Sequence, residues 1–352
     1  MMQDHNYIKK VIELNLYITK TWNPKMKWMW GEALYGYSLT LLDEHFHEET
    51  YTDFLKGYVD YYVKNPPRVD QSDTAAPGLI TYQMYKKFKD DNYKKLTDRV
   101  LNYIMNEPRL IEDSVNHLGN SLEGKFYPKS IWVDSIMMFS LFPALYAKEN
   151  NDQDMMEVAA RQPRIMAKYM QDEKDKLWYH SYWVKRKTHY PKRKIYWGRG
   201  NGWVVCALPM IIEHVGDHKE KAHMIQIFQD TCKALLPYQR SDHTFETVIN
   251  FVGKTYRELS FTALVAAGFM RGYRMGLLDK NFKEAGIRAF KACVDALIYH
   301  DGHIYFPEIS GPTIPLPLFP YIGYKIIPRG KNWSYGLAAL NFAMIEFDLL
   351  KK

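Results

Sequence analysis

Two aspartates stand where acid–base chemistry could take place. Asp134 lies in FYPKSIWVDSIMMF, directly before a strongly apolar segment, and Asp73 lies in QSDTAAPGL before another. Each carboxylate is either a helix cap that accepts backbone amide hydrogen bonds or a general acid whose pKa is raised by apolar, aromatic surroundings. If both open helices around one cleft, they form the carboxylate pair that glycosidic chemistry uses.

The segment YWGRGNGW, residues 196–203, is a more specific signal. Its three glycines make a poor helix interior and a good ligand-contacting turn, because glycine lets the backbone approach a ligand closely. Arg199 offers a planar fork suited to a carboxylate, while Trp197 and Trp203 offer ring faces. The alternative is a tight loop whose tryptophans pack inward.

One kind of segment recurs six times: a small or polar opening with an aromatic or acidic residue, followed by a long apolar helical stretch. The openings are Trp30, Asp73, Trp132, Gly198, Arg257 and Asn332. Between these segments lie six amphipathic helix candidates with charged residues on one face. They span residues 6–20, 47–64, 92–106, 153–171, 218–236 and 281–299.

The alternation of these two kinds of helix predicts the fold class. A helix that is apolar all round must be buried on all sides, so we expect an all-α fold, an (α/α)6 barrel of six inner and six outer helices. The barrel would form a single catalytic domain over residues 1–352. A helical solenoid is the alternative, but its repeats are usually about 20 to 45 residues long and near-constant in length. Closure of the ring would gather the unusual opening residues at one mouth: Trp30, Glu32, Asp73, Trp132, Asp134, Arg199, Asn201, Trp203, Glu258 and Trp333.

Composition excludes several classes of protein. Of the 352 residues, 47% are hydrophobic and 25% charged, which is typical of a folded chain and excludes disorder. The longest apolar run, residues 203–212, is too short for a membrane span of roughly 18 residues or more. The start MMQDHNYIKK has charges where a secretory signal is apolar, so we expect a cytoplasmic protein. Cys206, Cys232 and Cys293 lie far apart in apolar segments and are expected to be reduced core thiols.

The connections and charges suggest the kind of ligand. Three connections, 107–131, 173–197 and 300–331, are long enough to shape a cleft, and the alternating aromatics of the second indicate a strand-like excursion. Its basic run, 185–194, either attracts an acidic or sulfated oligosaccharide or is simply solvated. The net charge of +7 is too diffuse to indicate nucleic acid but suits a small acidic ligand. No metal or cofactor is predicted, because these histidines show no shared metal-ligand spacing: His45, His47, His214 and His243.

Five motifs, in order along most of the chain, resemble a known family. They are DTAAPG at 73–78, YPKSIWVD at 127–134, YHSYW at 179–183, WGRGNGW at 197–203 and ELSFTALVAAGFMRGYRMG at 258–276. The chain resembles the unsaturated rhamnogalacturonyl hydrolases of glycoside hydrolase family 105, and next the unsaturated glucuronyl hydrolases of family 88. The WGRGNGW and WVD elements are the specific ones. The fold of that family is an (α/α)6 barrel, in agreement with the repeat pattern.

The resemblance implies hydrolysis through hydration of a double bond. The substrate would be the 4,5-unsaturated uronic acid that a polysaccharide lyase leaves at a non-reducing end. Asp134 would protonate C4 as general acid and then take the proton of the water that adds at C5. Asp73 matches the second important acid. Substrate contacts carried over, or placed at the same mouth, are Trp30, His180, Trp197, Arg199, Asn201 and Trp203, with Arg199 the candidate for the sugar carboxylate.

The family pattern has one local departure. Family members often have a histidine eleven residues before the catalytic aspartate, where this chain has Glu123, and His117 lies six residues further upstream. Either the leaving sugar differs or His117 reaches the same space.

The sequence also leaves other functions open. An epimerase, a conventional inverting glycosidase or a non-catalytic sugar-binding protein could use the same barrel, and a nucleic-acid binder would rest only on residues 185–194. The chain could act as a monomer or a homodimer.

Overall fold

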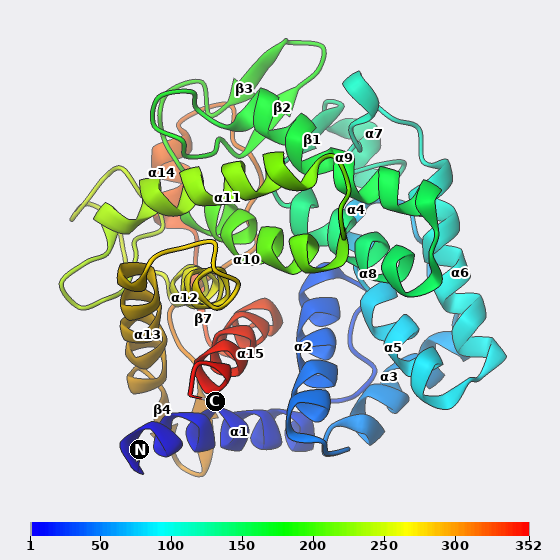
Figure 1. Cartoon of the computed structure of the whole chain (residues 1–352), viewed down its shortest axis with the longest axis vertical. Helices are drawn as coiled ribbons and strands as arrows, with labels where there is room; N and C mark the ends of the chain where they lie inside the picture. The colour runs from blue at the N-terminus through cyan, green and yellow to red at the C-terminus, as the bar shows by residue number, and fades with distance from the viewer. Residues whose placement is uncertain (1, 352) are drawn as a thin grey trace.

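The computed structural model describes residues 2–351 and consists mainly of two rings of helices (Figure 1). The inner helices pack side by side in chain order, and the last one returns to the first, which closes the ring. They are α2 (Trp30–Phe46), α5 (Gly78–Phe88), α8 (Leu141–Asn150), α10 (Gly198–His214), α12 (Leu259–Arg274) and α15 (Ser334–Leu349).

The outer helices each cover an inner neighbour. The contacts are α1 on α15, α3 and α6 on α5, α9 on α8, α11 on α10 and α13 on α12. The prediction of an all-α (α/α)6 barrel, with six inner and six outer helices, is confirmed. The outer helices are α1 (Met2–Thr21), α3 (Thr52–Lys64), α6 (Asp91–Asn106), α9 (Gln153–Met170), α11 (Lys221–Leu235) and α13 (Lys280–Asp295).

Burial of the inner helices explains their uniformly apolar sequences. In α10 residues 198–212 are all buried, and in α15 residues 334–347 are all buried. Close approach matters as much as hydrophobicity. A Cβ at Gly268 of α12 would lie 2.2 Å from the carbonyl oxygen of Val205 in α10, so only glycine lets these two backbones meet.

The structure corrects one predicted opening. The third inner segment does not begin as a helix at Trp132, because residues 130–132 form strand β1 (Ser130–Trp132). A turn and a π-helical segment, η2 (Ile136–Ser140), lead into α8. Strand β1 pairs antiparallel with β2 (Ser181–Trp183), which pairs with β3 (Thr188–Tyr190), so the strand-like excursion is confirmed. A local helical pattern could not reveal a pairing between segments fifty residues apart.

Smaller elements occupy the remaining connections. The predicted outer helix 281–299 ends early, because β4 (Ile298–His300) pairs with β5 (His303–Tyr305). Strand β6 (Ile309–Ser310) pairs with β7 (Arg329–Gly330) at the base of the last connection. The other short elements are α4 (Ser72–Ala75), η1 (Ile111–Asp113), α7 (Leu122–Phe126), η3 (Leu236–Tyr238) and α14 (Pro320–Ile326).

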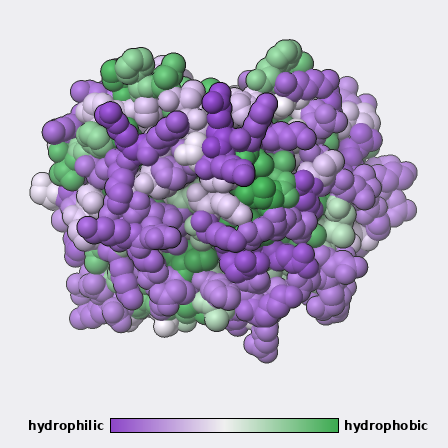
Figure 2. All heavy atoms as spheres, turned by 90° about the horizontal axis from the view of Figure 1, so that it is seen from above, coloured by the Kyte–Doolittle hydropathy of each residue, from purple (hydrophilic) through white to green (hydrophobic). Residues whose placement is uncertain are grey.

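The amino ends of the inner helices meet at one mouth, as predicted. Trp30 at the start of α2 stacks on Tyr335 at the start of α15 and contacts Trp203 near the start of α10 edge to face. The Trp28 indole donates a hydrogen bond to the carbonyl oxygen of Thr74 in α4 at 2.8 Å. Seen from above, the end of the molecule with β2 and β3 is mostly hydrophilic, with two apolar areas projecting at one edge (Figure 2).

Two further expectations concern the cysteines and the membrane. Cys206, Cys232 and Cys293 are buried and unpaired, which confirms their assignment to the core. Within residues 2–351, no helix combines the length and the apolar character needed to cross a membrane.

A buried ion-pair network joins three inner helices at the end opposite the mouth. The Glu346 carboxylate of α15 is 1% exposed and accepts hydrogen bonds from Arg271 at 2.5 Å and Arg274 at 2.7 Å, both on α12. Arg274 also pairs with Glu213 of α10 at 3.0 Å. A buried acid with two arginine partners cannot be neutralised without leaving positive charge uncompensated.

We therefore expect Glu346→Gln to lower the free energy of unfolding by about 3 kcal/mol, because one partner of a buried charge pair is removed. Chemical denaturation followed by circular dichroism measures the change. Glu284→Gln, at an exposed glutamate of α13, is the matched control and should change stability by less than about 0.5 kcal/mol. Equal stability of the two variants would contradict the structural role of the network.

Candidate active site

Asp134 occupies the turn between β1 and η2. Its backbone carbonyl accepts hydrogen bonds from the amides of Met137 and Met138, so the residue begins the π-helical segment. The Val133 amide donates to the His180 carbonyl at 3.0 Å, which fixes this turn against the chain that enters β2. The Asp134 side chain is 14% exposed, and its Oδ2 has no hydrogen-bond partner among the described residues. A capping carboxylate would be satisfied by backbone amides, so this oxygen is available for chemistry.

Asp73 lies in the first turn of α4, at the same mouth. The helix cap here is Gln71, whose side chain and that of Thr74 form a capping box. The Asp73 carboxylate therefore does not serve as the cap. It is 16% exposed and lies 3.5 Å from Nε2 of His117.

Each carboxylate faces a buried histidine that stacks on a tryptophan. His180 Nε2 lies 3.4 Å from Asp134 Oδ2, and its ring stacks on Trp197 with centroids 4.1 Å apart. His117 stacks on Trp132 at 4.3 Å. Burial lowers the pKa of His180 and lowers that of His117 to about 4, so both imidazoles are neutral near pH 7.

The partners of the second ring nitrogens orient both imidazoles. His180 Nδ1 lies 3.0 Å from the hydroxyl of Tyr324, which is buried and whose pKa burial raises far above its usual value. The neutral tyrosine can donate a hydrogen bond to Nδ1, and in that tautomer Nε2 carries the ring proton and faces Asp134.

The imidazole of His117 contacts a pair of serines, each next to one of the two aspartates in sequence. His117 Nδ1 lies 2.8 Å from Ser135 Oγ, which lies 3.2 Å from Ser72 Oγ. These serines neighbour the two aspartates in sequence and link them across the mouth.

The two acids have pKa shifts in opposite directions. Burial raises the pKa of Asp73 well above its usual value, and the negative charges of Asp134 and Glu123 raise it further. Burial also opposes ionisation of Asp134, but the contact with His180 and the fields of His117 and Arg199 outweigh it and lower its pKa. In the free protein the raised pKa therefore belongs to Asp73, and the pKa of Asp134 is shifted opposite to the rise that the general-acid reading expects.

Arg199 lies in a different environment from the one expected. Its side chain is 1% exposed, and its two terminal nitrogens donate hydrogen bonds of 2.7 Å to the carbonyl oxygens of Ser310 and Gly311. The guanidinium lies between the rings of Trp197 and Tyr335, at 4.9 and 4.8 Å from their centroids. Arg199 thus fixes the start of the connection after β6, and its Nε is one of several buried polar atoms without a hydrogen-bond partner among the described residues.

Three other residues are predicted to contact the substrate: Asn201, Trp203 and Trp30. Asn201 is buried in the first turn of α10 and donates to the carbonyl oxygens of Trp178 and Trp197, so it fixes the start of that helix. The expectation that the glycines of 196–203 make a poor helix interior is wrong, because residues 198–203 are helical and buried, where the glycines allow close packing. Trp203 is buried to 1% exposure, whereas Trp30 is half-buried at the mouth.

Sequence reasoning missed Tyr324, Tyr335 and the serine pair. The tyrosines come from a connection and a helix start without a distinctive motif, and the serines directly flank the DTAAPG and WVD motifs but give no signal of their own. At the position eleven residues before Asp134, where family members often have a histidine, this chain has Glu123, which lies exposed on α7. His117 lies beside Asp73 instead.

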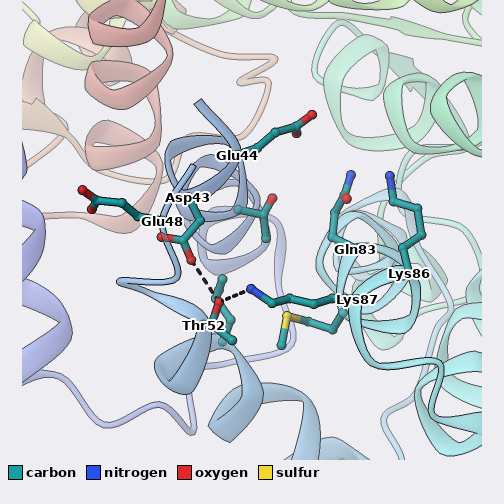
Figure 3. A pocket seen from close by; sticks show the side chains of 10 residues that line it. Asp43, Glu44, Glu48, Thr52, Gln83, Lys86 and Lys87 are labelled. Atoms are coloured by element: carbon teal, nitrogen blue, oxygen red, sulfur yellow. Dashed lines mark hydrogen bonds between the residues drawn. The ribbon is translucent and has the colours of Figure 1, made fainter. Parts of the chain in front are cut away.

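Of the cavities in the described structure, one adjoins the mouth and another lies at the opposite end of the barrel. A cleft of about 440 Å³ adjoins the mouth through Tyr335, and its other lining residues are Trp22, Lys27, Glu32, Pro312, Lys331, Asn332, Trp333 and Ser334. A second cavity, about 320 Å³, lies between the carboxyl ends of α2 and α5, where Asp43 and Lys87 both hydrogen-bond Thr52 (Figure 3). Its two lysines form ion pairs with glutamates outside the lining, Lys86 with Glu149 at 2.8 Å and Lys87 with Glu49 at 3.0 Å, and the cavity lies at the end of the barrel away from Asp73 and Asp134. Across residues 2–351, no cluster of histidine, cysteine, aspartate or glutamate side chains is arranged to hold a metal ion.

Comparison with known proteins identifies the family. Residues 5–350 match Glycosyl Hydrolase Family 88. The unsaturated rhamnogalacturonyl hydrolase YesR of Bacillus subtilis (strain 168) is 26% identical over 341 residues, which cover 95% of this chain and 93% of that protein. An unsaturated 3S-rhamnoglycuronyl hydrolase of Alteromonas sp. (strain LOR) is 26% identical over 270 residues, 73% of this chain and 61% of its own length.

A solved structure has the same fold. A family 105 glycoside hydrolase of C. acetobutylicum ATCC 824 superposes with a TM-score of 0.85 at 24% identity, covering 97% of this chain and 99% of that one. The resemblance inferred from the motifs is confirmed by the match over nearly the whole chain. This chain therefore belongs to Glycosyl Hydrolase Family 88 and is a glycosidase.

Proposed function

We propose that this protein removes a 4,5-unsaturated uronic acid from the non-reducing end of lyase-generated oligosaccharides by hydrating the C4=C5 bond, with Asp134 as general acid and base. The observation that carries the proposal is the buried, unpartnered Oδ2 of Asp134, which faces a neutral histidine 3.4 Å away. The names of the relatives, hydrolases of unsaturated rhamnogalacturonyl and 3S-rhamnoglycuronyl groups, support it. The whole chain would act as one catalytic unit.

The lowered pKa of Asp134 in the free protein is compatible with a negatively charged substrate, whose binding would raise that pKa again. The sugar carboxylate adds negative charge near Asp134 and excludes water, and both effects raise the pKa of Asp134. The acid takes up a proton in this state and delivers it to C4, which leaves an oxocarbenium-like centre at C5. The raised pKa of Asp73 favours its neutral form, which adds no second negative charge that would repel the substrate.

The remaining steps follow from the chemistry of the product. Water adds at C5 and gives its proton to the Asp134 carboxylate, so the acid is regenerated. The resulting hemiketal opens to a ketone at C5 and leaves a hemiacetal at C1, which expels the neighbouring sugar. His180 Nε2, 3.4 Å from Asp134 Oδ2 in the free protein, would move into hydrogen-bond contact when that carboxylate is ionised during these steps.

The sugar contacts belong to the same proposal. Trp30, half-buried at the mouth, would contact the sugar with its ring face, while the buried Trp197, Trp203 and His180 would support that face from behind. Arg199, through Nε, and the connection it fixes would approach the sugar carboxylate, while Asn201 positions the turn.

Replacing Asp134 by Asn should lower kcat at least about a thousandfold, because general acid–base catalysis contributes about 10² to 10⁴. The assay follows loss of the ultraviolet absorbance of the conjugated C4=C5 carboxylate, with unsaturated disaccharides from pectin, ulvan-type and glycosaminoglycan sources. Asp154→Asn, at an exposed aspartate of α9, should keep full activity. If the protein only binds sugars, neither wild type nor Asp134→Asn will cause absorbance loss, and both will bind the unsaturated disaccharide equally well.

Replacing Asp73 by Asn should stabilise the fold increasingly as pH rises. The folded pKa of Asp73 is raised, so its carboxyl stays protonated while the unfolded chain already ionises, and wild-type stability falls as pH rises towards the folded pKa. Asparagine is neutral at every pH and avoids this loss. The melting temperature of the variant should match wild type near pH 4 and exceed it at pH 7. A variant less stable than wild type at pH 7 would contradict the assignment of the proton to Asp73.

A further inference from the structure

Basic side chains without acidic partners gather beside the active-site turn. The chain carries a net charge of +7, and seven exposed basic residues lie in two short segments, 125–129 between α7 and β1 and 185–193 from the β2–β3 turn to just after β3. Within the described residues none of the seven forms an ion pair. We call them the basic patch: Lys125, Lys129, Lys185, Arg186, Lys187, Lys192 and Arg193.

Lys194, which directly follows the last residue of the patch, differs from it because it forms ion pairs. Lys194 forms ion pairs with Asp172 at 3.1 Å and Asp175 at 2.9 Å, which anchor the end of the hairpin to the barrel. The patch residues have no such role. The nearest carboxylate in sequence is Glu123 on α7, which is exposed and also has no ion-pair partner within residues 2–351.

The sheet fixes the patch to the catalytic groups. Strand β1 separates Lys129 from Asp134, and β2 begins directly after His180. Trp183 pairs with Ser130, and the Val184 amide donates to the carbonyl oxygen of Lys129 at 3.2 Å, so the two basic segments lie side by side. Five residues of chain place Lys129 within about 18 Å of Asp134. The hairpin projects from the top of Figure 1, and that end is largely hydrophilic in Figure 2.

We propose that the basic patch binds the anionic remainder of a longer substrate, a saccharide chain that carries several carboxylates or sulfates, while its unsaturated end occupies the active site. This proposal rests on the proposed function, which sets which end of the saccharide enters the active site. Clustered positive charge raises the local concentration of a polyanion, and the effect weakens when salt shortens the screening length to about 10 Å or less.

The test compares two variants with the same loss of charge. One replaces Lys129, Lys185, Arg186 and Arg193 by Gln; the control replaces the exposed lysines Lys9, Lys20, Lys95 and Lys233 of the outer helices α1, α6 and α11 by Gln. At low ionic strength the patch variant should raise KM for an unsaturated hexagalacturonate about tenfold with unchanged kcat. Its KM for an unsaturated disaccharide with a neutral leaving sugar should stay within twofold, and the control variant should match wild type for both.

Equal KM changes for the two substrates, or the same loss in the control variant, would overturn the proposal. Calorimetric binding of a saturated hexagalacturonate needs no turnover and separates this proposal from the proposed function. Weaker binding by the patch variant alone supports the patch even if no unsaturated sugar is hydrolysed. Binding of a short DNA duplex more tightly than the hexagalacturonate would overturn it in favour of a nucleic-acid surface.

Discussion

The mouth of this barrel buries two carboxylates but has charge compensation for one. Asp134 faces the N–H of a neutral histidine and lies in the positive field of Arg199, whereas Asp73 faces a histidine whose own pKa is about 4. Two ionised acids at this mouth would repel each other, and this repulsion adds to burial in raising the pKa of Asp73. The two histidines, with Tyr324 and the serine pair that contact them, create the different surroundings of the two acids.

The barrel supplies the rigidity that this arrangement requires. Closure of the inner ring brings six helix starts together, and close backbone contacts such as that at Gly268 leave little freedom for them to separate. The connection from Ser310 to Arg329 then covers the mouth. Arg199 holds it through the carbonyl oxygen of Ser310, and Tyr324, within the connection, contacts His180. Burial of Asp73 costs stability at neutral pH, which is the trade-off expected where function requires a perturbed group.

Much of the fold could be read from periodicity, because the signal is local. Uniformly apolar and one-sided helices alternate, and five of the six inner openings lie within five residues of the start of a helix of the ring. The Trp132 opening could not be read in this way, since β1 depends on pairing with residues 181–183. Arg199 shows the same limit: its partners, the carbonyls of Ser310 and Gly311, lie more than a hundred residues away. The sequence identified the two acids, but the direction of their pKa shifts depends on histidines brought in by other segments.

The central claim is that water adds to the double bond before the sugars separate. The most direct measurement follows one reaction by two readings, the absorbance of the conjugated double bond and the amount of free leaving sugar in rapidly quenched samples. Hydration predicts that absorbance loss precedes sugar release or keeps pace with it from the first turnover. Release of the leaving sugar while the absorbance persists would mean direct glycosidic cleavage and would contradict the account.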